Sequence, residues 1–348
     1  MKILFNCPLP FALAHGGMQT QIEQTSATLI ALGLEVEPLR WWDEQQRGDV
    51  IHYFGVAPVE QIRLAQAKGL PLVMTNLFTA ACNRSESQLR RQGRFVRAIL
   101  KLPFGHGLKQ QLAWPSFREC DANVVGLECE RRVLELVHDR PREQVDVVPL
   151  GLAPIFLEAG RGTRSADFLL CAGTITRRKN CVALARLARA AQTPILFVGK
   201  PYAESDSYWQ EFSRLVDGRW VRHQPHVADP AAMVALLQQA RGAVVLSDYE
   251  NWCLSAHEAA ACGLPVLLPD QNWSRERFGG QAHYFERIGF SPRNVEILKQ
   301  FYAAAPSLPA PAIQLFTWAD AARRLKTTYE RVAKARADLF SCARQATC

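Results

Sequence analysis

Apolar and polar residues follow a repeated strand-and-helix pattern in the first half of the chain. Short apolar runs predict strands at 2–6, 36–42, 49–55, 70–76, 121–127 and 145–151. Helical spacing separates several of them, as at 18–32, where Gly33 follows as a stop signal, and at 59–69. Strands that alternate with helices predict a parallel sheet covered on both faces.

The same pattern starts again in the second half. Apolar runs predict five further strands at 167–175, 193–200, 219–224, 240–247 and 264–270. The stretch 154–166 is rich in Gly, Ser and Arg and shows no period, so we place the junction there. We expect domains at 1–155 and 156–312, followed by residues 313–348 with a helix at 319–340. In two facing doubly wound units, the default ligand site is the cleft between them.

Composition excludes several classes of protein. The chain has 348 residues, of which 48% are hydrophobic and 21% charged, which argues against a disordered chain, a collagen and a coiled coil. No apolar run reaches the ~18 residues of a membrane span, and we interpret the first residues as a buried strand rather than a signal peptide. The ten cysteines are scattered without a C-x-x-C pair, so we expect neither disulfides nor zinc.

Charge indicates an acidic partner. The net charge is +8, and basic residues concentrate at 84–118 and from 321 to the end. At helical spacing, Arg90, Arg94, Arg97 and Lys101 share one face of a helix at 88–101. Phe95 falls on the opposite, apolar side. Such a helix is either an ordinary helix packed on its domain or a basic helix lying on an anionic bilayer.

Two carboxylates carry the strongest chemical signal. Glu250 follows an apolar strand, and Glu258 lies in a helix that starts near Leu254 and stops at Gly263. The first amides of such a helix can hold a diphosphate, and a carboxylate beside them can accept sugar hydroxyls. For an isolated pair at this spacing, a surface Glu and a helix Glu would be the ordinary interpretation.

The sequence around this pair resembles the glutamate element of the retaining glycosyltransferases of family 4, which have the GT-B fold. In that element two glutamates are separated by seven residues. The matching residues are Glu250, Leu254, Glu258, Ala259, Ala261, Cys262, Gly263, Pro265 and Val266. Asn251 and Cys253 replace two glycines of the family, which leaves the choice of sugar donor open.

A second segment resembles the family sequence G-T-L-E-P-R-K-N, through Gly173, Thr174, Arg178, Lys179 and Asn180. Transfer of a sugar from a nucleotide leaves a diphosphate, whose charge needs cations of this kind. Weaker matches at 15–18, 147–156, 274–285 and 316–332 follow in family order. The last of these corresponds to a family helix that returns to the first domain.

The resemblance implies an α/β GT-B enzyme with two facing Rossmann-like domains. It implies transfer, with retention, of a sugar from a UDP- or GDP-linked donor to a saccharide or lipid-linked acceptor, in bacterial surface polysaccharide or glycolipid synthesis. The sequence motifs favour mannosyltransferase-like relatives that use a GDP sugar. We also expect a cytoplasmic protein, peripheral on the inner leaflet through 88–101, with no nucleic-acid partner.

The resemblance also assigns roles to residues. Arg178 and Lys179 would bind the diphosphate, Glu258 the ribose, and Glu250 the hydroxyls of the donor sugar. The remaining donor-binding candidates are Gly16, Gly17, Gly173, Thr174 and Leu254. No convincing D-x-D occurs, so we expect transfer without a metal and without another cofactor.

The acid–base chemistry and the activity have alternatives. His52 is either an acceptor contact or a core histidine, and Asn76 stands where many members carry a histidine, so we name no general base. One alternative function is a degenerate GT-B subunit that binds a nucleotide sugar or a partner without catalysis. Another is a GT-B sugar epimerase. A dinucleotide dehydrogenase fits poorly, because no G-x-G-x-x-G follows the first strand.

Overall fold

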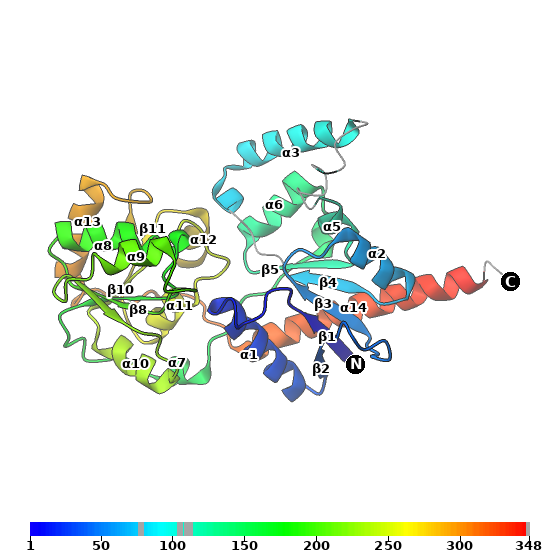
Figure 1. Cartoon of the computed structure of the whole chain (residues 1–348), viewed down its shortest axis with the longest axis horizontal. Coiled ribbons are helices and arrows are strands. Elements are labelled where there is room, and N and C mark those ends of the chain that lie inside the picture. The colour runs from blue at the N-terminus through cyan, green and yellow to red at the C-terminus, as the bar shows by residue number, and fades with distance from the viewer. Residues whose placement is uncertain (76–79, 103–106, 108–113, 346–348) are drawn as a thin grey trace. The chain divides into compact units, whose positions relative to one another are not determined.

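The chain folds into two compact units (Figure 1). The structure is a computed structural model that describes residues 1–75, 80–102, 107 and 114–345. Unit 1 comprises Met1–Pro10, Thr20–Leu150 and Trp318–Cys348, and unit 2 comprises Phe11–Gln19 and Gly151–Thr317. The boundaries expected after residues 155 and 312 each lie five residues from these changeovers.

Unit 1 is built on a six-stranded parallel sheet in the order β2-β1-β3-β4-β5-β6. Its inner strands β3, β4 and β5 are buried at every residue, which is why they read as continuous apolar runs. The strands are β1 (Lys2–Asn6), β2 (Glu35–Pro38), β3 (Val50–Phe54), β4 (Leu72–Thr75), β5 (Ala122–Val125) and β6 (Val145–Val147).

Helices cover both faces of this sheet, with α1 and α14 on one face and α2, α5 and α6 on the other (Figure 1). A further helix, α3, packs on α6. The helices of unit 1 are α1 (Gly17–Ala31), α2 (Val59–Ala67), α3 (Glu86–Lys101), α5 (Trp114–Glu119), α6 (Glu128–His138) and α14 (Trp318–Gln345), with short turns η1 (Ala80–Asn83) and η2 (Arg142–Gln144). Gly17 to Gln19, at the start of α1, group with unit 2.

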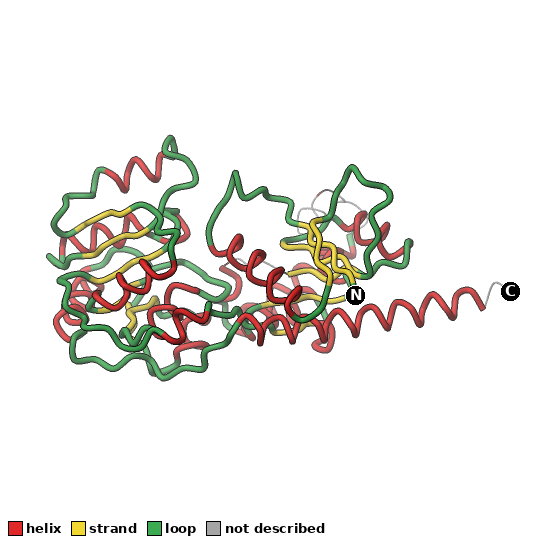
Figure 2. The backbone as a smooth tube through the Cα atoms, turned by 90° about the horizontal axis from the view of Figure 1, so that it is seen from below, coloured by secondary structure: helices red, strands yellow, loops and turns green. Residues whose placement is uncertain are grey.

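The last helix, α14, belongs to unit 1, although the rest of that unit ends at Leu150. Tyr329 places its hydroxyl 2.6 Å from Nδ1 of the buried His52, whose Nε2 lies 2.7 Å from Oγ1 of Thr75. Ion pairs join Arg331 to Asp146 and Arg336 to Asp121. Figure 2 shows the far end of α14 running past the strands of unit 1 as one long red helix.

Unit 2 repeats the architecture with the order β12-β11-β10-β7-β8-β9, again all parallel. Its strands are β7 (Leu169–Ala172), β8 (Ile195–Val198), β9 (Val221–Gln224), β10 (Gly242–Val244), β11 (Val266–Pro269) and β12 (His283–Phe285). Its helices are α7 (Pro154–Glu158), α8 (Cys181–Ala190), α9 (Ser207–Ser213), α10 (Pro230–Gln239), α11 (Leu254–Ala261), α12 (Asn272–Phe278) and α13 (Pro292–Ala304), with the turn η3 (Arg177–Lys179).

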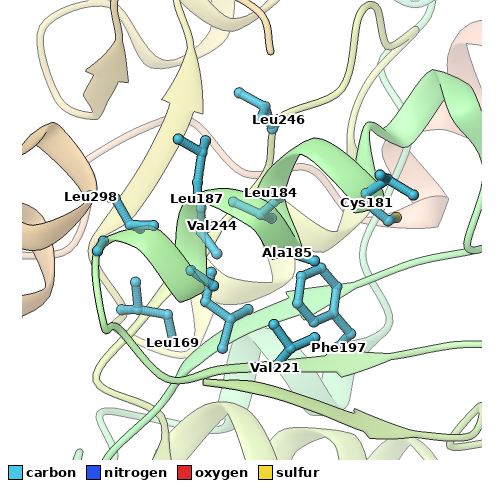
Figure 3. Packing of buried hydrophobic residues seen from close by; sticks show 14 of the residues in the cluster. Leu169, Cys181, Leu184, Ala185, Leu187, Phe197, Val221, Val244, Leu246 and Leu298 are labelled. Carbon is cyan, nitrogen blue, oxygen red and sulfur yellow. The ribbon is translucent and has the colours of Figure 1, made fainter. Parts of the chain in front are cut away.

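The core of unit 2 lies where α8, α9 and α13 cover one face of its sheet. Figure 3 shows Leu184, Ala185 and Leu187 of α8 in one buried cluster with Leu169 and Phe197 of the strands. All five of these side chains are fully buried. Burial of this kind stabilises the fold by about 25 cal/mol for each Å² of apolar surface removed from water. The architecture confirms the predicted α/β fold with two doubly wound units.

Three local predictions were wrong. The strand expected at 36–42 ends at Pro38, and the next residues form a turn closed by the ion pair of Arg40 with Asp43. The short strand β12 was not predicted, because its residues do not form an apolar run. It lies within the family match at 274–285. Phe95, expected on the buried side of its helix, is 66% exposed, because the face of α3 that meets α6 is a narrow line of Leu89, Gly93 and Val96.

Candidate functional site

The candidate site lies in unit 2, at the carboxyl ends of two neighbouring strands. β7 and β10 are paired in the sheet, yet the chain visits β8 and β9 between them. This makes the β7–β10 boundary the topological switch point, where open α/β sheets bind their ligands. The loop after β7 carries Arg178 and Lys179, and the loop after β10 carries Glu250.

The structure brings these three side chains together. Nζ of Lys179 lies 2.5 Å from Oε1 of Glu250, and Nη1 of Arg178 lies 2.9 Å from Oε2 of the same carboxylate. Arg178 also donates to the carbonyl of Tyr249 at 2.9 Å. Two cations therefore face one carboxylate, and the cluster carries one positive charge in excess.

Burial makes this pairing strong. The side chain of Glu250 is 8% exposed, that of Lys179 17% and that of Arg178 36%. Burial alone would raise the pKa of Glu250, but the charges of Lys179 and Arg178 outweigh it and lower that pKa to about 2. Burial would lower the pKa of Lys179, and the Glu250 carboxylate outweighs it and raises that pKa. All three groups stay charged at neutral pH, and Arg178 is the most accessible to a ligand.

Hydrogen bonds of Asn180 connect the loop after β7 to the loop after β10. It adopts the left-handed conformation with φ of 52°, which asparagine tolerates better than most residues. Its side-chain amide donates to the carbonyl of Leu246 at 3.1 Å and to the carboxylate of Asp248. The amide of Asp248 donates in return to the carbonyl of Arg178 at 2.8 Å. Sequence reasoning matched Asn180 to the family without assigning it this role.

Glu258 lies in the second turn of α11, the helix whose first residue is Leu254. Burial raises the pKa of Glu258 to about 7, against the opposing charge of Lys179. Protonated and ionised forms of this carboxyl are therefore both present near neutral pH, which suits a group that exchanges hydrogen bonds with hydroxyls.

The loop into α11 is held by an aromatic stack that sequence reasoning missed. The ring of Trp252 lies parallel to that of His257, with centroids 4.8 Å apart, and the guanidinium of Arg277 lies 4.4 Å from the Trp252 centroid. Nδ1 of His257 lies 3.0 Å from the carbonyl oxygen of Cys253. Cys253 itself is left-handed, with φ of 61°, at a position where the family has glycine.

The glycine segment before α1 groups with unit 2. Gly16 has φ of +121°, and a Cβ there would lie 2.9 Å from Oγ1 of Thr174. The ring of His15 contacts that of Tyr202 at 5.3 Å between centroids. Gly17 begins α1, and Gly173 directly follows β7 with φ of +148°. Gly16, Gly173 and Thr174 thus lie with the site loops.

A small pocket borders the cation pair. Its walls come from the ends of β7 and β10 and the start of α8, namely Cys171, Ala172, Gly173, Thr174, Lys179, Cys181, Val245, Leu246 and Ser247. The cysteines and Ser247 carried no functional signal in the sequence. The pocket places Gly173, Thr174 and Lys179 on one surface.

Of the two residues considered for acid–base chemistry, the structure describes one. His52 is fully buried in the sheet of unit 1 between Tyr329 and Thr75, which favours a core histidine. Burial lowers its pKa to about 3. Asn76 lies outside the described residues.

Comparison with known proteins agrees with the sequence motifs. Residues 122–274 match the family described as "Family 4 Glycosyltransferase in conflict systems". No curated protein matches the chain. The predicted resemblance to family 4 is thereby confirmed.

Similar solved structures span nearly the whole chain. Sucrose-phosphate synthase from Thermosynechococcus elongatus aligns with a TM-score of 0.64 and 15% identity over 99% of this chain and 100% of that one. WaaG, a glycosyltransferase involved in lipopolysaccharide biosynthesis, aligns with a TM-score of 0.59 and 15% identity over 97% and 98%. HepE from Anabaena, solved in complex with UDP-glucose, aligns with a TM-score of 0.60 and 13% identity over 98% and 100%. These similarities establish the GT-B fold, and over residues 122–274 the chain is similar to the glycosyltransferases of family 4.

Proposed function

We propose that the chain transfers a sugar, with retention and without a metal ion, from a nucleotide-diphosphate sugar to a saccharide or lipid-linked acceptor. The observation that carries the proposal is the cluster of Arg178 and Lys179 on Glu250 at the switch point of unit 2. As the bond to the sugar breaks, charge builds on the diphosphate, and cations fixed in advance stabilise it.

The three residues divide this work. Glu250 keeps both cations charged and in place, so that neither has to be ordered when the donor binds. The partly exposed guanidinium of Arg178 keeps donors for a phosphate oxygen, and Lys179 adds a nearby point charge. We also propose that Glu250 contacts the hydroxyls of the donor sugar and that Glu258 contacts the ribose.

The structural relatives support particular substrates. The HepE structure in complex with UDP-glucose supports a uridine donor beside the guanosine donor that the motifs favour. The involvement of WaaG in lipopolysaccharide biosynthesis supports a cell-surface saccharide as acceptor. The matched family description instead names conflict systems, a different setting for the same reaction.

A thermal-shift screen with UDP, GDP, ADP and CDP tests the donor site, because a ligand that binds the folded state raises its melting temperature. We expect one nucleotide to stabilise the protein and Arg178→Ala to weaken its affinity by about tenfold or more. Arg186→Ala is the matched control, since Arg186 pairs with Glu211 on the surface of the same unit. Equal affinities in the two variants would refute the assignment of Arg178.

Product analysis separates transfer from its alternatives. With the stabilising nucleotide sugar and a membrane extract as acceptor source, we expect release of nucleotide and a product of unchanged anomeric configuration, also in the presence of EDTA. Glu250→Gln should lose this activity. Conversion of the donor with no acceptor present would instead indicate an epimerase, and nucleotide-sugar binding without conversion a non-catalytic subunit.

We also propose that α3 contacts an anionic bilayer. Its outer face carries the exposed residues Arg90, Arg91, Arg94 and Lys101, with Phe95 among them, while Leu89, Gly93 and Val96 pack inward. Basic residues attract anionic headgroups, and an aromatic ring among them can enter the interface. None of the helices in the described ranges is long and apolar enough to cross a membrane.

Vesicle sedimentation tests this contact. At low salt, reversing Arg90, Arg91 and Arg94 to Glu should release the protein from vesicles that contain phosphatidylglycerol. Arg97 is left unchanged, because its ion pair with Asp139 joins α3 to the end of α6, whereas the ion pair of Arg90 with Glu86 lies within α3. Reversing three arginines of unit 2, Arg186, Arg189 and Arg214, gives the same change in net charge, and equal release by both variants would contradict a specific role for α3.

A further inference from the structure

Unit 1 holds two adjacent tryptophans in the solvent. Trp41 is 89% exposed and Trp42 is 66% exposed, although tryptophan is highly buried on average. They occupy the two central positions of the turn Arg40–Asp43, in which the amide of Asp43 donates to the carbonyl of Arg40 at 3.2 Å. The two rings meet at 86°, with centroids 5.4 Å apart, and so present two nearly perpendicular faces.

The turn is held from behind by polar contacts. The guanidinium of Arg40 donates to Asp43 at 3.0 and 2.8 Å and to Glu37 at 2.9 Å. The side chain of Gln46 donates to Glu37 at 3.1 Å and accepts from the amide of Arg40 at 2.8 Å. The backbone under both rings is therefore ordered before any ligand arrives, which lowers the entropic cost of binding.

The turn stands at the ligand-binding edge of its sheet. It follows β2, whose Pro38 pairs with Phe5 near the end of the parallel strand β1. The sheet order changes direction between β1 and β3, so the switch point of unit 1 lies one strand away from β2, about 5 Å. The tryptophans therefore rise from the edge where an α/β sheet receives its ligand.

The surroundings indicate which ligand fits. Residues 37–49 carry four carboxylates and two guanidiniums, so this segment has a net charge of −2 and repels an anionic bilayer. Aromatic faces are electron-rich and attract the weakly positive C–H groups of a sugar ring. The indole N–H groups and the exposed side chains of Glu44, Gln45 and Arg47 can reach its hydroxyls.

We propose that Trp41 and Trp42 form a stacking platform for the acceptor saccharide. This inference rests on the proposed sugar transfer and adds a binding site for the acceptor. The platform selects for a saccharide in which neighbouring sugar units can each place a C–H face on one indole, because the two indole faces lie nearly at right angles. Its contribution is to position the acceptor, and the diphosphate chemistry stays with unit 2.

Indole N–H signals in an NMR titration test the platform directly. The probes are neutral oligosaccharides of three to five residues built from glucose, galactose or mannose, added without nucleotide. The signals of Trp41 and Trp42, identified by their loss in the single variants, should move with at least one probe. Trp41→Ala and Trp42→Ala should weaken that affinity by about tenfold or more, and Trp41→Phe and Trp42→Phe should retain part of it. Ile30→Ala, at a residue that is 53% exposed in unit 1, is the control and should change nothing.

Three results would overturn the inference. Indole signals of Trp41 and Trp42 that no probe moves would do so, as would alanine variants with unaltered affinity. A Trp41→Ala/Trp42→Ala double variant that loses vesicle binding or a dimeric mass, while keeping oligosaccharide affinity, would assign the surface to lipid or to a second copy. A nucleotide screen that fails while the oligosaccharide titration succeeds would contradict only the proposed donor chemistry.

Discussion

At the scale of the residue, Glu250 has the central structural role in the site. An unpaired carboxylate at its depth would lose its charge, whereas two cations keep it ionised. The cations depend on it in turn, because removing one partner of a buried ion pair typically costs 3–5 kcal/mol. Arg178, Lys179 and Glu250 therefore act as one unit, and the effects of their substitution will not add.

Glu258 has the opposite property, and this gives a prediction. Its pKa is about 7 in the folded protein and near 4.5 when unfolded, so the folded state loses stability as pH rises between these values. Glu258→Gln should therefore raise the free energy of unfolding at pH 8 by on the order of 2 kcal/mol, and with it the melting temperature. At pH 4.5 the substitution should change little. Calorimetry at both values checks this, with the exposed Glu204→Gln as control. A variant that is less stable at pH 8 would contradict it.

The sequence could indicate which residues belong to the site, but not which of them pair. Arg178 and Glu250 were found because each follows an apolar strand and matches a family motif. That Glu250 pairs with both cations depends on β7 lying beside β10. No local sequence pattern predicts a strand order in which β8 and β9 are skipped. For the same reason Trp41 and Trp42 were taken for strand residues, since the contacts that hold their turn reach back to Glu37 and forward to Gln46.

At the scale of the element, strands and helices were largely predictable, because inner strands such as β3, β4, β5 and β11 are buried at every residue. The packing between helices was not. α3 contacts α6 through Gly93, where a Cβ would lie only 2.1 Å from the carbonyl oxygen of Leu136. Helical periodicity locates such a face but gives no measure of how closely two backbones approach.

Gly93→Ala should therefore destabilise unit 1, although alanine is the better helix former. The overpacking costs about 1–3 kcal/mol and exceeds the ~1 kcal/mol gained in helix propensity. Urea unfolding should show a lower midpoint. Arg94→Ala, on the exposed face of the same helix, should stay within about 0.5 kcal/mol of the unchanged protein. A Gly93→Ala protein as stable as the unchanged one would show that the α3–α6 contact is looser than described.

At the scale of the whole molecule, buried histidines in both units make the protein sensitive to acid. Burial lowers the pKa of His52 and His257 to about 3 and that of His138 to about 4. In the unfolded chain these groups take up protons near pH 6.5, so the folded state loses stability as pH falls below that value. The three histidines together outweigh the opposite contribution of Glu258.

The melting temperature should accordingly be lower at pH 5 than at pH 7.5. Each buried histidine can lose up to about 2 kcal/mol of its stabilisation between pH 6.5 and pH 5. Thermal unfolding followed by circular dichroism at the two values, in buffers of equal ionic strength, gives the comparison. An unchanged or higher melting temperature at pH 5 would mean that these rings take up protons without unfolding.

The path of the chain has a consequence for its synthesis. Residues 151–317 leave the ribosome before α14, so the larger part of unit 2 can fold while unit 1 still waits for its final helix. Until Tyr329 emerges, the Nδ1 of His52 lacks the hydroxyl that completes its hydrogen bonding. A nascent chain stalled before Trp318 would therefore expose an unfinished first sheet to chaperones and proteases beside a nearly finished second one.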